Sequence, residues 1–424
     1  MENRTIVCFG PGPRFKGGMQ NYNTSLALAL DKEERNNVHI VSWTQQYPAI
    51  IPREFVDKSS TTDLLQGSRV KVTYITNYNN PFSWKETADY IISLKPEMVT
   101  FQWSIALQGL PMAFIAKRLR KAGIHVVFDI HFVIQKEHSS IDKFLTKYAL
   151  KHASSFVVHA LHTFEELKMV FPERSFGLVD SLDVTNNSIT QVAKLYHPIY
   201  DLYKPIPNFN LEEEKAKLGL KKHVFLYFGF IRKYKGLDLA IQAFAELCKE
   251  RDDVSFLICG ESFWKTLDDS KWSTKVKQML FGWAKKIVLR KSDDEREDNP
   301  LEWIEKLGIE DNCVVFNRFI SNEELPKFFQ VSDAAVLFYR TATPSGIESL
   351  SYNFKMPILA TKVGHFPETI VDGFNGYLAE AEDIQSMKNQ MLRFLESPID
   401  RENVAKATEN MSWTNYAKAI CNYE

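Results

Sequence analysis

Short apolar runs alternate with longer amphipathic stretches along most of this chain. An apolar run bounded by polar residues predicts a buried strand, and apolar residues at helical spacing predict a helix. In the first half, residues 111–122 have helical spacing, and another helix is expected to begin near Gln20 or Asn21. The strands expected in this half are residues 5–9, 38–43, 70–75, 98–102, 126–130 and 155–158. Such alternation indicates a parallel sheet that helices cover on both faces.

The second half repeats the pattern after a proline-rich connection, residues 196–207. We therefore expect an α/β fold of two doubly wound, Rossmann-like domains, residues 1–200 and 201–403, which face each other across a cleft. A C-terminal helix within residues 404–424 is expected to pack back toward the first domain. The strands expected in the second half are residues 224–228, 255–259, 313–317, 334–337, 358–360 and 376–378, and the helices are residues 237–250, 323–331 and 384–396.

One segment, residues 264–302, interrupts the alternation of strands and helices. It contains a basic, partly amphipathic stretch, residues 275–291, and an acidic run, residues 293–298. A basic amphipathic helix can lie on an anionic membrane. A surface helix packed on its own domain explains the same pattern, so both interpretations stay open.

Composition narrows the class of protein. The 424 residues exceed what a single core normally holds. A net charge of −1 argues against nucleic-acid binding through bulk charge. The five cysteines are scattered and lack CxxC spacing, which favours a reducing compartment over disulfides or a zinc site. The opening apolar run is too short for a signal peptide, so we expect a cytoplasmic protein, with contact to the inner face of a membrane left open.

The loop at residues 228–236 has the composition of a phosphate site. It joins an expected strand to an expected helix, where backbone N–H groups and the helix dipole attract an anion. Its cations, Arg232 and Lys235, could neutralise a diphosphate, each through a contact of roughly 1.5–3 kcal/mol. An ordinary loop with solvated lysines is the alternative.

Several blocks of sequence, taken in their order and spacing, resemble GT-B-fold glycosyltransferases of the family-4 type. Members of this family are retaining, nucleotide-sugar-dependent enzymes, and the resemblance covers nearly the whole chain. Residues 46–48, 80–84, 101–103, 197–202 and 340–346 further resemble a bacterial and archaeal subgroup with a Phe-Gly-Phe-Ile-Arg-x-Tyr-Lys-Gly loop. The blocks that carry the family resemblance are residues 16–19, 126–131, 229–236, 345–346, 356–364, 367–370 and 372–378.

The resemblance implies that a sugar is transferred from a nucleotide sugar to a glycan or lipid-linked acceptor. Charge then builds on the departing diphosphate, where cations and N–H groups stabilise the transition state. The implied catalytic residues are His131, Arg232 and Lys235, and Glu137 is implied to contact the acceptor. The residues implied to bind the donor are Gly17, Gly18, Gly229, Gly236, Gly260, Glu261, Arg318, Phe319, Ile320, Thr343, Ser345 and Gly346. Structural explanations stay open for several of these residues: a plain turn at Gly17 and Gly18, a capped loop histidine at His131, and a solvated charge at Glu137.

No cofactor or metal is expected, because the chain lacks an Asp-x-Asp motif and cationic side chains would replace the metal. The family has two late glutamates, and the positions that align with them hold Ala342 and Leu350 in this chain. Glu348 lies nearby but two residues out of register. The family's usual arginine in the loop is Phe230 here, with Arg232 as a substitute. These departures keep two alternatives open: a non-catalytic binding protein of the same fold, and another GT-B enzyme such as a nucleotide-sugar epimerase or an inverting transferase. The expected partners are a nucleotide sugar and a glycan or lipid-linked acceptor but no nucleic acid, and an anionic membrane surface is an open alternative.

Overall fold

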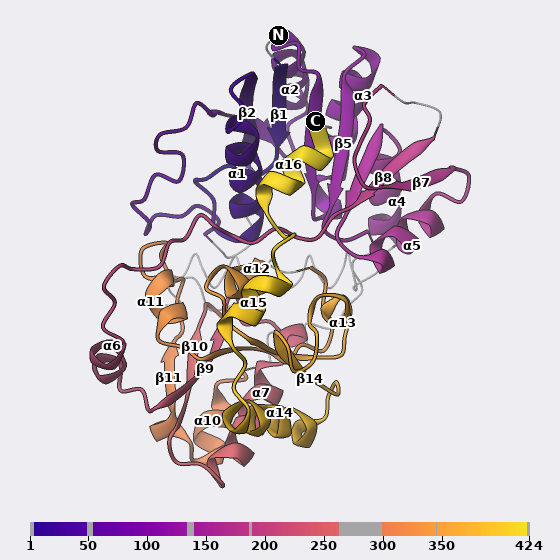
Figure 1. Ribbon diagram of the computed structural model, residues 1–424. Coiled ribbons are helices and arrows are strands. Elements are labelled where there is room, and N and C mark those ends of the chain that lie inside the picture. The colour runs from indigo at the N-terminus through magenta and orange to yellow at the C-terminus, as the bar shows by residue number, and fades with distance from the viewer. Residues whose placement is uncertain are drawn as a thin grey trace.

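The computed structural model describes residues 4–48, 54–133, 140–185, 189–262, 299–344 and 346–421. These residues form two domains, each built on a parallel sheet (Figure 1). Within them, the first sheet has eight strands in the order β3-β2-β1-β4-β5-β6-β8-β7, and the second has six in the order β11-β10-β9-β12-β13-β14. In both sheets the chain reverses its direction of winding beside the first strand of the domain, as in doubly wound folds. The predicted fold class is therefore confirmed.

The first domain buries both faces of its sheet. Alternate residues of β1 point to opposite faces, so that Ile6 and Cys8 lie in one hydrophobic cluster and Val7 and Phe9 in another. β7 and β8 were not predicted from the sequence, because both are short and β7 is only half-buried at the sheet edge. The strands are β1 (Arg4–Phe9), β2 (Asn36–Gln45), β3 (Lys71–Asn77), β4 (Met98–Trp103), β5 (His125–Ile130), β6 (Ser155–Val158), β7 (Phe176–Val179) and β8 (Thr190–Lys194). The helices are α1 (Gly18–Asp31), α2 (Pro81–Ser93), η1 (Ala106–Gln108), α3 (Gly109–Lys121), α4 (Ser140–Leu150) and α5 (Leu161–Val170).

The second domain is packed around two buried, mostly apolar central strands, β9 and β10, which pair in parallel. The amphipathic helices α7 and α14 pack together on this sheet. The strands are β9 (His223–Phe228), β10 (Val254–Cys259), β11 (Cys313–Phe316), β12 (Ala334–Leu337), β13 (Ile358–Thr361) and β14 (Gly376–Ala379). The helices are α6 (Leu211–Leu218), η2 (Lys233–Lys235), α7 (Leu237–Cys248), α10 (Glu302–Leu307), η3 (Glu310–Asn312), α11 (Leu325–Gln330), α12 (Gly346–Asn353), α13 (Phe366–Thr369) and α14 (Ile384–Glu396).

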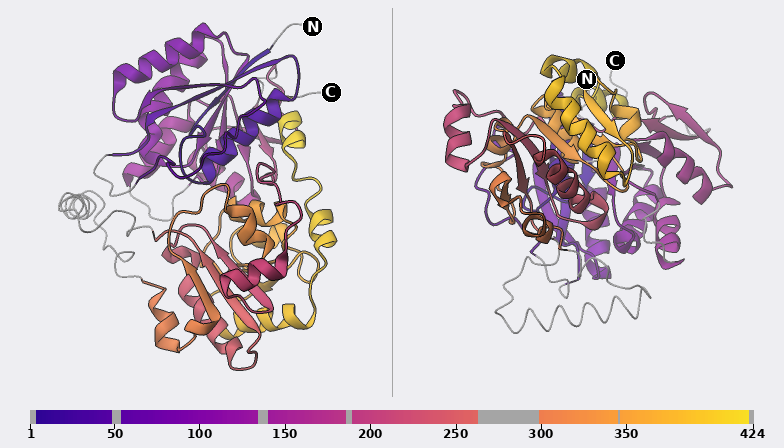
Figure 2. Two further views of the ribbon diagram at one scale, coloured as in Figure 1. Left: turned by 90° about the vertical axis from the view of Figure 1, so that its left-hand side faces the viewer. Right: turned by 90° about the horizontal axis from the view of Figure 1, so that it is seen from below.

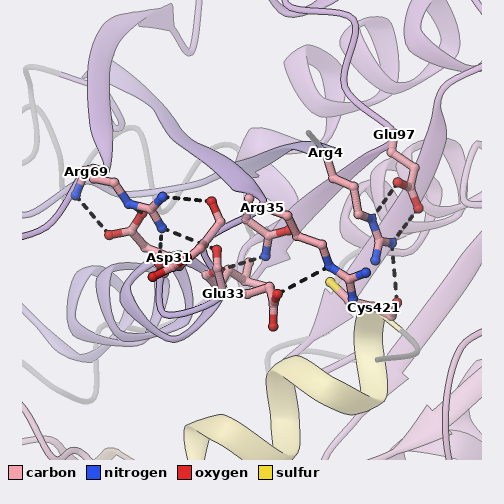
Figure 3. A network of polar contacts seen from close by, with 10 residues as sticks. Arg4, Asp31, Glu33, Arg35, Arg69, Glu97 and Cys421 are labelled. Carbon is pink, nitrogen blue, oxygen red and sulfur yellow. Dashed lines mark hydrogen bonds and ion pairs between the residues drawn. The ribbon is translucent and has the colours of Figure 1, made fainter. Parts of the chain in front are cut away.

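The C-terminal segment runs from the second domain back to the first, as the yellow ribbon shows (Figures 1 and 2). It contains α15 (Arg401–Ala407) and α16 (Trp413–Cys421). α16 packs against α1, and the Ala419 carbonyl accepts a hydrogen bond from the Leu182 N–H at 2.7 Å. Arg4 of β1 reaches the same helix through the Cys421 carbonyl, at 3.3 Å (Figure 3). The C-terminal helix therefore ties the second domain to the first.

Two sequence features fall outside the described residues. The basic stretch 275–291 and the acidic run 293–298 both lie there. Among the helices that the structure does describe, none is both long enough and apolar enough to cross a bilayer.

Candidate functional site

A cavity with about 900 Å³ of empty space lies between the two domains. Loops at the carboxyl ends of strands from both sheets form its walls, which is where doubly wound folds bind ligands. Of the residues proposed from the sequence to bind a donor, those that line the cavity are Gly17, Gly18, Gly229, Gly260, Glu261, Arg318, Phe319, Ile320 and Gly346, together with the predicted catalytic residue Lys235.

Lys235 is the central cation of this cavity. It lies in η2, directly after the β9 loop, and only 7% of its surface is exposed. Burial, and then the charge of Arg232, lower the pKa of Lys235 to about 7. Among the described residues, no carboxylate forms an ion pair with it. A buried amine without a counter-ion, facing a cavity, is suited to receive an anion.

Two glycines shape the loop that presents Lys235. Gly229 has a φ of 101°, and a Cβ built there would lie 3.1 Å from the Lys235 Nζ. Gly236 has a φ of 60°, and its Cβ would clash with the carbonyl oxygen of Phe338. Gly236 does not line the cavity, but the tight turn into α7 depends on it.

The loops after β10 and β11 form the far wall of the second domain. A Cβ at Gly260 would clash with the Gly229 carbonyl, so the loop after β10 lies in direct contact with the loop after β9. Arg318 points its guanidinium at Glu324, with hydrogen bonds of 2.7 and 2.6 Å, which fixes its side chain. Lys16 of the first domain lies 4.7 Å from the ring of Phe319, so a cation–π contact crosses between the domains.

The first domain contributes the start of α1. Gly17 has a φ of 105° and precedes the first turn without a side-chain cap, which leaves early N–H groups of the helix available. Gln20 lines the cavity at 4% exposure, and within the described residues its buried Oε1 accepts no hydrogen bond. Tyr200 bridges the two domains, because its hydroxyl donates to the Gly18 carbonyl at 2.9 Å and its ring abuts Gly346.

The sequence did not single out four polar residues of the lining. Gln20 and Asn21 follow the glycine pair directly, so their position in the first turn of a helix was a usable signal. Tyr200 and Tyr203 come from the connection between the domains, and only tertiary packing brings them to the cavity. The Tyr203 hydroxyl donates to Asn322 Oδ1 at 3.0 Å, so this hydrogen bond joins two residues of the cavity lining.

Two further proposed residues, Arg232 and Thr343, are described by the structure but do not line the cavity. Arg232 is half-buried beside Lys235 and acts on it through charge. Thr343 is exposed. Glu137 and Ser345 lie outside the described residues. Nine of the twelve residues that the resemblance implies for donor binding therefore line one cavity.

His131 belongs to a buried cluster behind the cavity. Its Nε2 lies 3.0 Å from Gln102 Oε1, and its ring meets Tyr22 edge-on at 4.6 Å. Burial is the main reason why the pKa of His131 falls to about 4. The ring is therefore neutral at pH 7, and it can donate or accept a hydrogen bond but carries no charge.

Asp129 forms the acidic centre of this cluster. Its carboxylate contacts His159 Nε2 at 2.9 Å and accepts from the Tyr416 hydroxyl of α16 at 2.6 Å. Burial alone would raise the pKa of Asp129, but His159 outweighs it and holds the pKa at about 2. Asp129, His131 and His159 offer ligand atoms within 4.8 Å of one another, so these three could also hold a divalent metal.

The positions of the missing family glutamates are apolar here. Leu350 lines the cavity, and Ala342 is buried behind it. Glu348 does not replace them, because its carboxylate binds His365 and accepts from Thr369 at 2.5 Å and from Tyr352 at 3.2 Å. Glu348 therefore supports the packing of α12 and α13 and does not reach a ligand.

Comparison with known proteins agrees with this architecture. Spore coat protein SA of Bacillus subtilis (strain 168) is 25% identical over 218 residues, covering 49% of this chain and 50% of that protein. D-inositol 3-phosphate glycosyltransferase of Corynebacterium diphtheriae is 23% identical over 267 residues, covering 59% and 53%. The chain thus spans about half the length of the curated relatives it matches.

Solved structures match over the whole chain. The crystal structure of Anabaena Alr3699/HepE in complex with UDP has a TM-score of 0.62 at 14% identity, with 99% of this chain and 98% of that chain covered. The same protein in complex with UDP-glucose gives 0.59 at 15% identity, with 97% and 94% covered. This likeness shows the two-domain fold.

Residues 209–411 match the family model described as glycosyl transferases group 1. This match lies almost entirely within the second domain of the chain.

Proposed function

We propose that this protein is a glycosyltransferase that takes a sugar from a nucleotide-sugar donor and passes it to a glycan or lipid-linked acceptor. The observation that carries the proposal is Lys235, a buried amine without a carboxylate partner in the described residues, at the wall of an interdomain cavity. The second domain holds the donor diphosphate, and the first domain holds the acceptor. The loop at residues 228–236 supports placing the chain in the bacterial and archaeal subgroup that carries a Phe-Gly-Phe-Ile-Arg-x-Tyr-Lys-Gly loop.

The leaving diphosphate gains negative charge as the bond to the sugar breaks. Lys235 and the early N–H groups of α1 face the same cavity from opposite domains, so both can stabilise that charge. Burial, and then the charge of Arg232, lower the pKa of Lys235 in the free protein, and an incoming diphosphate restores the charge of its amine. His131, neutral at pH 7, supports the sugar side from behind α1.

The cavity argues against hydrolysis by a carboxylate pair. Among the described residues that line it, Glu261 is the only carboxylate. Glycosidases of the usual kind need two such groups flanking the scissile bond. Transfer with retention, by substitution on the face from which the diphosphate leaves, fits a site that offers cations and N–H groups in their place.

We further propose a UDP-sugar donor and no requirement for a metal. A neighbour of the same fold was solved in complex with UDP and with UDP-glucose. The cavity here lies at the carboxyl ends of strands of both sheets, where doubly wound folds bind ligands. Lys235 supplies the positive charge that a metal would give to a diphosphate. Activity undiminished by EDTA would support this, whereas activity lost to EDTA and restored by a divalent ion would point to Asp129, His131 and His159 as its ligands.

A non-catalytic binding protein is the second candidate, favoured by the apolar Leu350 in the cavity wall. The two candidates differ in turnover. Purified protein is incubated with UDP-sugars, and release of UDP without acceptor is followed. The transferase proposal predicts slow release that falls by about 100- to 1,000-fold in Lys235→Met, as for other losses of charge stabilisation. Lys233→Met, on the same turn but exposed, is the matched control and keeps the wild-type rate. Binding of UDP-sugar without any release, with or without glycan acceptors, would favour the binding protein.

A further inference from the structure

A second hollow lies at the opposite end of the first sheet and contains about 1390 Å³ of open space. Its walls come from residues at or just before the starts of β4, β5, β6, β7 and β8. The cavity between the domains lies at the carboxyl ends of the strands, so this hollow is a separate place in the first domain.

Two arginines dominate the hollow. Arg120 stands in the last turn of α3, and Arg174 lies between α5 and β7. Burial lowers the pKa of Arg174, the charge of Glu173 raises it, and the charge of Arg120 lowers it, so both of these charges lie near the Arg174 guanidinium. Arg120 donates to Ser154 Oγ, and Arg174 Nη2 donates to the Lys151 carbonyl. The Nη1 of Arg174 is buried and, within the described residues, has no acceptor.

Two histidines add donors to the same region. His125 lines the hollow, and its Nε2 lies 2.9 Å from Ser155 Oγ. His152 lies near Arg120 and Arg174, whose charges act on it. The buried Nε2 of His152 has no hydrogen-bond partner among the described residues. Burial lowers the pKa of His152 to about 4, with further lowering from Lys151 and other nearby cations. Arg120 and Arg174 are among the cations that add to this lowering, so their charges lie near His152.

Negative charge in the hollow is already neutralised. Glu97 is the only carboxylate among the described residues that line it. Arg4 binds both of its oxygens, at 2.7 and 2.5 Å (Figure 3). Nearby, Glu173 pairs with Lys147 at 3.4 Å. Glu173 does not line the hollow, although its charge acts on Arg174. Within the described lining, the one carboxylate is paired with Arg4, so no lining carboxylate is left for Arg120 and Arg174.

We propose that this hollow is a second ligand site, which binds the phosphate group of a multiply charged phosphate-bearing ligand. The planar forks of two arginines match phosphate oxygens, and the orphaned Arg174 Nη1 supplies a donor whose partner would be the ligand. A buried donor without an acceptor costs free energy, which binding of an anion removes. The phosphate belongs either to a free small molecule or to a lipid headgroup, since Lys117 and Lys121 continue the positive surface along α3.

Titration calorimetry with pyrophosphate at low ionic strength tests this site. The titration uses the Lys235→Met protein, because that change removes the main cation of the interdomain cavity. We expect binding that weakens by about 100-fold in Lys235→Met/Arg120→Gln/Arg174→Gln, as for the loss of two charge-assisted contacts. The matched control is Arg118→Gln in the same background, since Arg118 lies on the same helix but pairs with Asp89. If the triple variant does not fold, Arg120→Gln alone, an exposed position, is expected to weaken binding by about 10-fold.

A flotation assay with anionic vesicles forms the second arm. Binding of pyrophosphate that depends on Arg120 and Arg174 identifies a free ligand, and vesicle binding with the same dependence identifies a headgroup. Either result supports the site. Equal binding by the parent and by the arginine variants, or no binding of either probe, would overturn it. This outcome is independent of the transferase proposal, which is tested at Lys235.

Discussion

Binding of a nucleoside diphosphate should take up a proton, because Lys235 is largely neutral in the free protein above pH 7 and charged in the complex. With a pKa of about 7, the free amine at pH 8 is protonated in roughly one molecule in ten. If the bound diphosphate raises the pKa to 10 or more, each binding event takes up about 0.9 proton. At pH 8 the terminal phosphate of the ligand is already fully ionised, so its own titration contributes little.

Titration calorimetry measures this uptake directly. UDP is titrated at pH 8 in two buffers with different heats of ionisation, and the difference in observed heat gives the number of protons. Lys235→Met should bind UDP about 10- to 150-fold more weakly and take up almost no proton. Lys233→Met, the exposed neighbour on the same turn, should match the wild type. Tight binding by the wild type without proton uptake at pH 8 would refute the assigned role of Lys235.

Three further predictions concern charge and stability. Arg232→Gln should raise the pKa of Lys235, because Arg232 helps to lower it, so the pH at which proton uptake is half-maximal moves upward in the same calorimetric experiment. Lys235→Met should raise the free energy of unfolding of the ligand-free protein below pH 7, by at most about 5 kcal/mol, and urea titrations should show this gain shrinking as pH rises from 7 toward 10.5, since the unfolded lysine then loses its proton as well. Tyr416→Phe removes a donor to the buried carboxylate of Asp129 and should cost about 1.5–3 kcal/mol in urea denaturation, whereas the exposed control Tyr196→Phe should change stability by less than about 0.5 kcal/mol. Unchanged stability in Tyr416→Phe would contradict the role given to α16.

Most strands of the fold could be predicted because each contains a short run of apolar residues. β9 and β10 are buried on both faces, so their sequences stand out from the flanking polar residues. β7 and β8 could not be predicted in the same way. β7 has no fully buried residue and sits at the sheet edge, so burial leaves little mark on its sequence.

The candidate site could be predicted where backbone chemistry demands particular residues. Gly17, Gly229 and Gly236 have positive φ values and shape the loops at the cavity, which is why their pattern is visible in the sequence. Tyr200 and Tyr203 could not be found, since their role depends on the path of the connection between the domains. The same limit applies to His131, whose place in a buried cluster with Tyr22 and Gln102 arises from tertiary packing.

The central claim is that a diphosphate binds between Lys235 and the start of α1. A crystal structure of the protein with UDP tests it most directly. The account predicts phosphate oxygens within about 3 Å of the Lys235 Nζ, with the nucleotide enclosed by the loops that carry Gly260 and Phe319. UDP bound elsewhere on the molecule, or an empty cavity at saturating UDP, would contradict it.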